Sequence, residues 1–127
     1  MFLNKKEESM STVLITGEHY DVDDVTRKYV IKKLSRLEKY LPRHARSSAS
    51  AEVKLRQINE SHGNKYEAEV IMHVPDRTLL AKDSTLNMLA AVDIVEAKLI
   101  NQLHKYKETT MRRAPRKRLF GRLRRAF

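Results

Sequence analysis

Lysine and arginine side chains recur at helical spacing in two stretches of the chain, and groups of this kind bind anions. In the first stretch, the basic side chains on one side of a helix are Lys28, Lys32, Arg36 and Lys39, with Lys33 on the flank. In the second stretch the spacing is i, i+3 and i+7, at Lys98, Asn101 and Lys105. One polar strip on a helix is usually a solvated face, but a matching strip on a second helix favours a surface for a polyanion.

The densest basic group lies at the C-terminal end. Residues 112–127 contain eight of the 26 basic residues and none of the 16 acidic ones, so the net charge of +10 falls to +2 for the rest of the chain. A polyanion site on the body of the protein must therefore come from local segregation of charge. The tail residues that we expect to contact nucleic-acid phosphates are Arg112, Arg113, Arg116, Lys117, Arg118 and Arg122.

The sequence predicts neither catalysis nor a bound metal or cofactor. The chain has no cysteine, no glycine-rich phosphate loop and no nucleophile motif. Its five histidines are scattered, without the i, i+4 pairing of a helical metal site. His73 could form an acid–base pair with Glu67 or Glu69 on a strand surface, but surface strands commonly carry such residues. We therefore expect a protein that is not an enzyme.

The chain of 127 residues is long enough for one domain with a modest core. We expect a disordered leader in residues 1–10, with Met10 as an alternative start, an α+β domain in residues 11–108 and a basic tail in residues 109–127. No apolar run approaches the roughly 18 residues of a membrane span, and the N-terminus lacks a signal-peptide core. These features predict a soluble, cytoplasmic protein.

The apolar pattern predicts the element order β-α-β-β-β-α. Alternating or β-branched runs, typical of strands, occupy residues 12–17, 49–58, 66–74 and 77–82. Apolar residues at steps of three and four, typical of helices, occupy residues 24–41 and 83–107. Pro42 ends the first helix, and Pro75-Asp76 turns the chain between the last two strands.

Each predicted helix carries one apolar stripe. The first comprises Val30, Leu34, Leu37 and Leu41, and the second comprises Met88, Val92, Val95, Leu99, Leu103 and Tyr106. Asp21 or Asp23 is the expected cap of the first helix, and Asp83 or Ser84 that of the second. Both helices must then cover the one apolar face of a four-stranded sheet, whose second to fourth strands are antiparallel.

This order resembles the bacterial ribosome hibernation factors, a family that comprises hibernation-promoting factor and the ribosome-associated inhibitor. The resemblance extends from about Leu14 to Lys107. The sequence pieces that carry it are ITG at 15–17, RKYVIKKLSRLEK at 27–39, NMLAAVD at 87–93 and KLINQL at 98–103. No single piece is diagnostic, but four pieces in the right order and spacing are fairly specific.

The resemblance implies a fold similar to a double-stranded-RNA-binding domain. It also implies a protein that occupies the decoding channel of the small ribosomal subunit and silences translation during stasis. The positions that match the family's contacts with ribosomal RNA are Lys33, Arg36, Lys39, Lys98 and Lys105. Three positions depart from the family: Asn101 replaces an Arg, Asn87 an Asp and Leu89 a Tyr. We therefore expect the short form of the family, without the extra domain of its long members, and a monomer off the ribosome.

The tail supports two interpretations. Pro115 could begin a short amphipathic helix, or the tail could be disordered in the free protein and order on RNA. A basic amphipathic helix also suits an anionic membrane surface. The preferred function is thus a ribosome-binding silencer, and the alternative is a peripheral membrane or generic polyanion binder acting through the tail. The sequence leaves open whether a small helper protein assists in pairing ribosomes.

Overall fold

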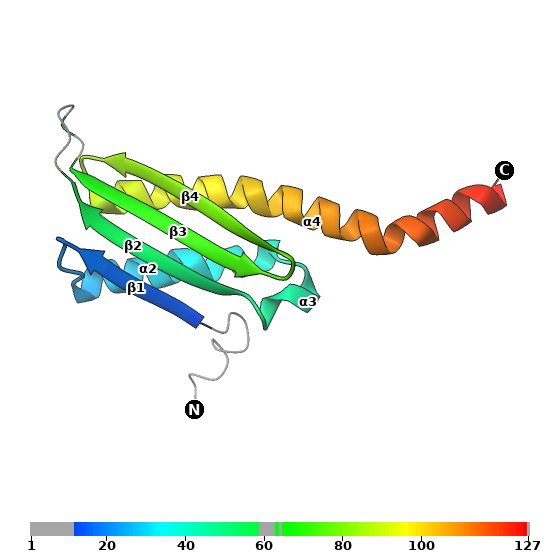
Figure 1. Cartoon of the computed structure of the whole chain (residues 1–127), viewed down its shortest axis with the longest axis horizontal. Helices are drawn as coiled ribbons and strands as arrows, with labels where there is room; N and C mark the ends of the chain where they lie inside the picture. Colours follow the sequence, from blue (N-terminus) through cyan, green and yellow to red (C-terminus); the bar gives the residue numbers. More distant parts are fainter. Residues whose placement is uncertain (1–11, 59–62, 64, 127) are drawn as a thin grey trace.

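Four strands and two long helices make up the fold of the computed structural model, which describes residues 12–58, 63 and 65–126 (Figure 1). For residues 110–126 the description covers the backbone alone. The leader expected in residues 1–10 lies outside the described residues. In chain order the elements are β1 (Thr12–Glu18), α2 (Asp24–Arg36), a 3-10 turn η1 (Leu37–Tyr40), α3 (Arg43–Arg46), β2 (Ser50–Gln57), β3 (Tyr66–Val74), β4 (Arg77–Thr85) and α4 (Met88–Ala126).

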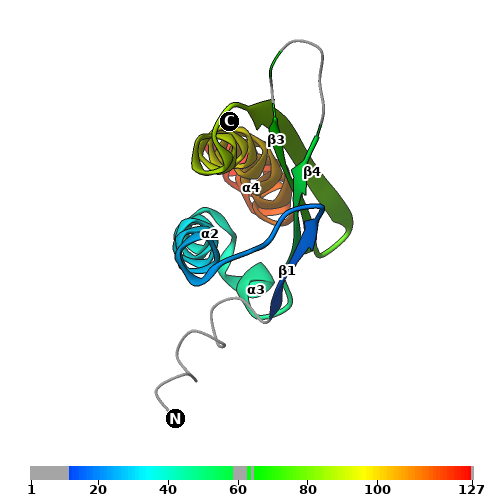
Figure 2. The ribbon, with the colours of Figure 1, turned by 90° about the vertical axis from the view of Figure 1, so that its left-hand side faces the viewer.

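The strands form one mixed sheet in the order β1-β2-β3-β4. β1 pairs with β2 in parallel, and the other two pairs are antiparallel. The parallel pair requires a crossover, which α2 supplies. Pro75 and Asp76 alone separate β3 from β4, and Asp76 adopts a positive φ of 67° that Asp tolerates in tight turns. Figure 2 shows α2 and α4 side by side on one face of the sheet, which confirms the predicted α+β fold and packing.

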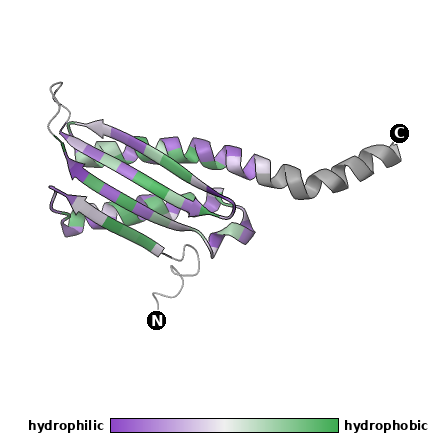
Figure 3. Cartoon of the chain, in the orientation of Figure 1, coloured by the Kyte–Doolittle hydropathy of each residue, from purple (hydrophilic) through white to green (hydrophobic). Residues whose placement is uncertain are grey.

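The core lies between the helices and the inner face of the sheet. The alternation of apolar and polar residues along the strands is visible in Figure 3, and it places Val53, Leu55 and Met72 inward. The predicted helix stripes are buried as expected: Leu37, Leu41, Leu99 and Leu103 are each 0% exposed. Tyr106 is also buried, and its hydroxyl donates to the carbonyl oxygen of Pro75 at 3.2 Å.

The helix boundaries differ in part from those predicted. Asp23 caps α2 as expected, accepting from the Thr26 amide at 2.8 Å, but the α-helix ends at Arg36 and a 3-10 turn completes the expected span. For α4 the predicted caps were wrong. Asp83 and Ser84 belong to β4, and Asn87 caps the helix instead, accepting from the amides of Leu89 (2.8 Å) and Ala90 (3.2 Å).

The tail backbone also differs from the sequence expectation. α4 continues to Ala126, so the helix passes through Pro115 rather than beginning there. Figure 1 shows α4 bending in its orange-to-red part. A proline inside a helix removes one hydrogen-bond donor and displaces the preceding turn, which produces such bends. The basic tail is therefore carried on an extension of α4.

Candidate nucleic-acid interface

The outer side of α2 and η1 presents an exposed basic ridge. Lys28, Lys32 and Arg36 lie on α2 and Lys39 on η1, and all four are exposed. A shallow depression runs across this side, lined by Lys28, Ile31, Lys32, Ser35 and Arg36. Ile31 is 36% exposed in this lining, so apolar surface lies beside three cationic side chains. Such a ridge can take several phosphates without reading bases.

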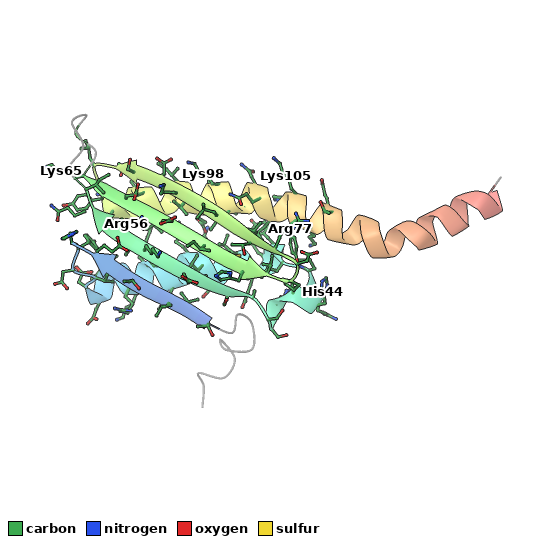
Figure 4. All side chains as sticks on the ribbon, viewed as in Figure 1. His44, Arg56, Lys65, Arg77, Lys98 and Lys105 are labelled. Carbon is green, nitrogen blue, oxygen red and sulfur yellow. The ribbon has the colours of Figure 1, made fainter. Side chains whose placement is uncertain are left out.

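The predicted strip on α4 divides into residues with different roles. Asn101 and Lys105 are exposed. Lys98 instead binds β4: its ammonium lies 3.1 Å from Asp83 Oδ2 and donates to the carbonyl oxygen of Lys82 at 3.0 Å. The hydrogen bond from Lys98 lowers the pKa of Asp83. Figure 4 shows Lys98 and Lys105 projecting from the same side of α4. This strip therefore borders the β4 edge of the sheet.

Where the two helices meet, the side chains are not uniformly basic. Lys33 lies between α2 and α4 with its side chain 15% exposed, 3.1 Å from Asp93 Oδ1 and 3.4 Å from Glu96 Oε1. The hydrogen bond with Asp93 raises the pKa of Lys33, so its charge is retained. Lys33 is thus committed to carboxylates inside the protein. The two predicted basic strips are separated by this acidic pair rather than joined into one surface.

One end of the molecule carries basic residues that sequence reasoning missed. α3 contributes Arg43 and His44, both exposed, in a segment that lies outside the predicted helices and strands. Arg77 lies over the Tyr106 ring at 5.2 Å, and Figure 4 shows it at the same end as His44. The signal in the sequence was the run RHAR after Pro42, too short for periodicity to register. α3 thus adds two exposed basic side chains shortly after Lys39 in the chain.

One arginine on the open face of the sheet is paired with carboxylates. Arg56 binds three carboxylates: Glu18 at 2.6 Å, Glu67 at 2.9 Å and Glu69 at 2.8 Å. The hydrogen bond from Arg56 lowers the pKa of Glu18. In turn, the hydrogen bonds to Glu18, Glu69 and Glu67 raise the pKa of Arg56. Because Nε, Nη1 and Nη2 of Arg56 already contact glutamate carboxylates, Arg56 is poorly placed to bind a phosphate. Arg56 therefore differs from the lysines of the basic ridge, which join no described ion pair.

On this face His73 pairs with a different glutamate from the two that the sequence suggested. His73 Nε2 lies 2.9 Å from Glu52 Oε2 across the β2–β3 pair, while Glu67 and Glu69 bind Arg56. Both partners of the His73 pair are more than two-fifths exposed, at 44% and 45%. Among residues 12–58, 63 and 65–126, no group of three or more His, Asp or Glu side chains could hold a metal ion. No helix in this described part is long and apolar enough to cross a membrane.

A protein-family model described as Sigma 54 modulation protein / S30EA ribosomal protein matches residues 13–111. The chain belongs to this family. The match takes in α2, the strands β2 to β4 and the part of α4 that carries Lys98, Asn101 and Lys105, and it ends before the basic residues of the tail. The family that the sequence motifs predicted is thereby confirmed.

Curated relatives of this S30EA chain are named for ribosome hibernation. The ribosome hibernation promotion factor of Lactococcus lactis is 36% identical over 102 residues, which are 80% of this chain and 52% of that protein. The ribosome hibernation promoting factor of Azotobacter vinelandii is 35% identical over 101 residues, 80% of this chain and 87% of that protein. The chain thus spans about half the length of the first relative and most of the second.

Two solved structures share the fold. The N-terminal domain of Thermus thermophilus Protein Y aligns with a TM-score of 0.64 at 23% identity, covering 77% of this chain and 98% of that one. A ribosomal subunit interface protein from Coxiella burnetii aligns with a TM-score of 0.62 at 24% identity, covering 76% and 98%. At this level of identity the two structures support the fold alone. They confirm the architecture expected from the sequence.

Proposed function

We propose that this chain is a ribosome hibernation factor of the cytoplasm. It binds the small ribosomal subunit, occupies the decoding channel and silences translation during stasis. Its family membership and the names of its relatives support a ribosomal partner. The chain contacts ribosomal RNA through the outer side of the helix layer, with the tail residues Arg112 to Arg122 as further contacts. Off the ribosome it is a monomer.

One observation carries this proposal: the lysines of the basic ridge keep their charges available. Within the part of the chain whose side chains are described, no ion pair involves Lys28, Lys32, Lys39 or Lys105. By contrast, Arg56 on the sheet face is bound by three glutamates. When unpaired lysines neutralise phosphates, the counterions condensed on the RNA are released, and this release drives binding to a large structured RNA.

We therefore propose only some of the predicted residues as RNA contacts. Arg36 and Lys39 remain RNA contacts together with Lys28 and Lys32, and Lys105 and Asn101 contribute from α4. Lys33 and Lys98 have partners inside the protein and act mainly by holding the helices in place. RNA that contacts both helices must accommodate the acidic pair between them, which favours phosphates placed along α2 over phosphates above Asp93.

The proposal is tested by binding to purified small ribosomal subunits across a range of KCl concentrations. The variant Lys28→Ala/Lys32→Ala/Lys39→Ala removes three charges from the ridge. The control Lys54→Ala/Lys65→Ala/Lys82→Ala removes three charges elsewhere, two of them on the open sheet face. The ridge variant should bind less tightly, with a salt slope smaller by about 2 to 3, since each lost phosphate contact lowers the slope by roughly 0.7–0.9. The control should stay near the wild type.

A second function remains a candidate because α4 extends as a helix through the basic tail. Basic amphipathic helices bind anionic membrane surfaces, and a binder of this type would depend on the tail and not on the ridge. Equal losses in both triple variants would point to generic polyanion binding. Binding to vesicles that contain anionic lipid, abolished by deletion of Arg112–Phe127 without any loss of ribosome binding, would assign the tail to a membrane.

A further inference from the structure

A line of polar side chains ties α2 to α4, alternating between the helices. The Tyr29 hydroxyl donates to Asp93 Oδ1 at 2.6 Å, and Lys33 lies 3.1 Å from the same oxygen. Lys33 also lies 3.4 Å from Glu96 Oε1. Glu96 Oε2, in turn, faces Arg36, whose Nε is 3.7 Å away. The line therefore ends on Arg36, at the margin of the proposed RNA surface.

Glu96 is the unusual member of this line. Its side chain is only 9% exposed, and Oε2 is buried without a hydrogen bond to any described residue. A buried carboxylate oxygen without a donor is unfavourable, so such an atom calls for a partner. Lys33 forms an ion pair with the other carboxylate oxygen of Glu96, Oε1. The cation nearest to Oε2 among the described ion pairs is Arg36, at a distance longer than a hydrogen bond.

Arg36 can satisfy that oxygen and still face outward. Its side chain is 54% exposed and its guanidinium carries five donors in a planar fork. If Nε turns toward Glu96, the two Nη groups remain free for bidentate contact with a phosphate. A side chain held in this way loses less conformational freedom on binding than a freely rotating one.

We propose that Glu96 is a positioning residue for RNA binding: it holds the Nε edge of Arg36 so that the Nη groups present themselves to a phosphate. This inference rests on the proposed function and deepens it. The approach of a phosphate draws Arg36 into its bound orientation and shortens the Arg36–Glu96 separation to hydrogen-bond length. Glu96 then gains the donor that its buried oxygen lacks.

Simple electrostatics makes the opposite prediction, which renders the inference testable. Glu96 is an acidic group beside a basic ridge, so its neutralisation should strengthen attraction to RNA if charge alone matters. If Glu96 positions Arg36, its neutralisation should weaken binding. The matched control is Glu108→Gln, which makes the same change on the same helix at an exposed residue that joins no described ion pair.

The experiment measures the dissociation constant of the full chain for purified small ribosomal subunits at fixed salt. Glu96→Gln should raise it about fivefold, as expected for a weakened charge-assisted hydrogen bond, while Glu108→Gln should leave it unchanged or lower it. Glu96→Asp, which keeps the charge but withdraws the carboxylate, should also weaken binding. In an Arg36→Lys background, which lacks the fork, Glu96→Gln should no longer weaken binding. Thermal unfolding of each variant identifies losses due to misfolding, and Glu96→Asp serves if Glu96→Gln does not fold.

The outcomes separate the inference from the function on which it rests. If folded Glu96→Gln binds as tightly as Glu108→Gln, or if its effect persists unchanged with Lys at position 36, Glu96 has no positioning role. Loss of binding in the ridge variant together with either of those results overturns the inference alone. If neither the ridge variant nor Arg36→Lys affects binding, the proposed RNA surface is wrong and the inference is overturned with it.

Discussion

The ammonium group of Lys98 donates to the carbonyl oxygen of Lys82 at 3.0 Å, which fastens α4 to the exposed edge strand β4. The same group lies 3.1 Å from Asp83 Oδ2. One helical turn later, Gln102 makes a second such contact, donating to the carbonyl oxygen of Leu80 at 2.8 Å. Free carbonyls on an edge strand are a template for unwanted pairing, and α4 covers them.

Lys98→Ala should therefore lower the stability of the domain more than it lowers ribosome affinity. We expect a loss of about 1 kcal/mol in the free energy of unfolding, a modest value because the side chain is half exposed and the ion pair is partly screened. Lys105→Ala, on the same side of α4, should change stability by less than about 0.5 kcal/mol. Urea unfolding of the two variants makes the comparison. Equal stability in both would show that the Lys98 contacts contribute nothing.

Asn87 is the second site at which a variant should act on stability. It caps α4 through the amides of Leu89 and Ala90. Asn87→Ala should cost about 1 kcal/mol, whereas Asn87→Asp should be neutral or stabilising because Asp caps equally well and favours the positive end of the helix. Thermal or urea unfolding tests this. A neutral Asn87→Ala would mean that another group caps the helix.

The Asp93–Lys33 pair gives a pH dependence at the acidic end. Burial tends to raise the pKa of Asp93, but hydrogen bonds from Tyr29 and Lys33 outweigh it, and the pKa lies below its ordinary value of 3.8. A carboxylate whose pKa is lowered by folding stabilises the protein above its unfolded-state pKa and loses this contribution as the pH falls through the folded value. The stability advantage of the wild type over Asp93→Asn should therefore be constant above about pH 5 and shrink below pH 3.8.

At alkaline pH the same pair should lose its contribution to stability as the pH rises, because Lys33 is then deprotonated. The hydrogen bond with Asp93 raises the pKa of Lys33 above its ordinary value of 10.5. Stability from a raised lysine pKa is fully present below 10.5 and is lost as the pH rises through the folded value. The advantage of the wild type over Lys33→Met should thus be flat from neutral pH to about pH 10 and decline above it. Urea titrations at several pH values measure both profiles, and a flat profile at both ends would contradict the pairing.

Much of the fold follows from local patterns, and the exceptions have non-local causes. The apolar steps of three and four that end on Leu41 and Tyr106 correctly identified the buried faces, because a helix with one buried side repeats its apolar residues at that spacing. The cap of α4 was misplaced because β4 is longer than its own residues indicate. Ser84 and Thr85 pair with Glu67 and Tyr66 on β3, and this ladder outcompetes an early helix start.

The site was predicted less completely than the fold. The basic spacing on α2 is visible in the sequence, but the partners of Lys33 are not, since Asp93 and Glu96 lie far along the chain and only the packing of the helices brings them together. Lys98 was similarly assigned to a solvent-facing strip because its partner, the backbone of β4, has no signature in the sequence. The four-residue helix α3 escaped notice because one turn is too short for a period.

α3 supplies a further prediction for ribosome binding. Arg43 is exposed and follows Lys39 of the ridge closely along the chain, so it should lie near RNA if the ridge does. Arg43→Glu should weaken binding to small subunits about tenfold, because it replaces an attraction with a repulsion. Arg27→Glu makes the same change at another exposed residue, on the side of α2 away from Arg36, and should have a smaller effect. Equal effects of the two variants would place the RNA elsewhere.

We propose that the helix layer, and not the sheet, faces ribosomal RNA in the decoding channel. A cryo-electron microscopy map of the full chain bound to the small ribosomal subunit would test this placement. We expect density for the chain in that channel, with Lys28, Lys32 and Lys39 within hydrogen-bonding reach of phosphates and Arg56 turned away from the RNA. Density for the chain outside the channel, or with Arg56 and its three glutamates against the RNA, would show that the placement is wrong.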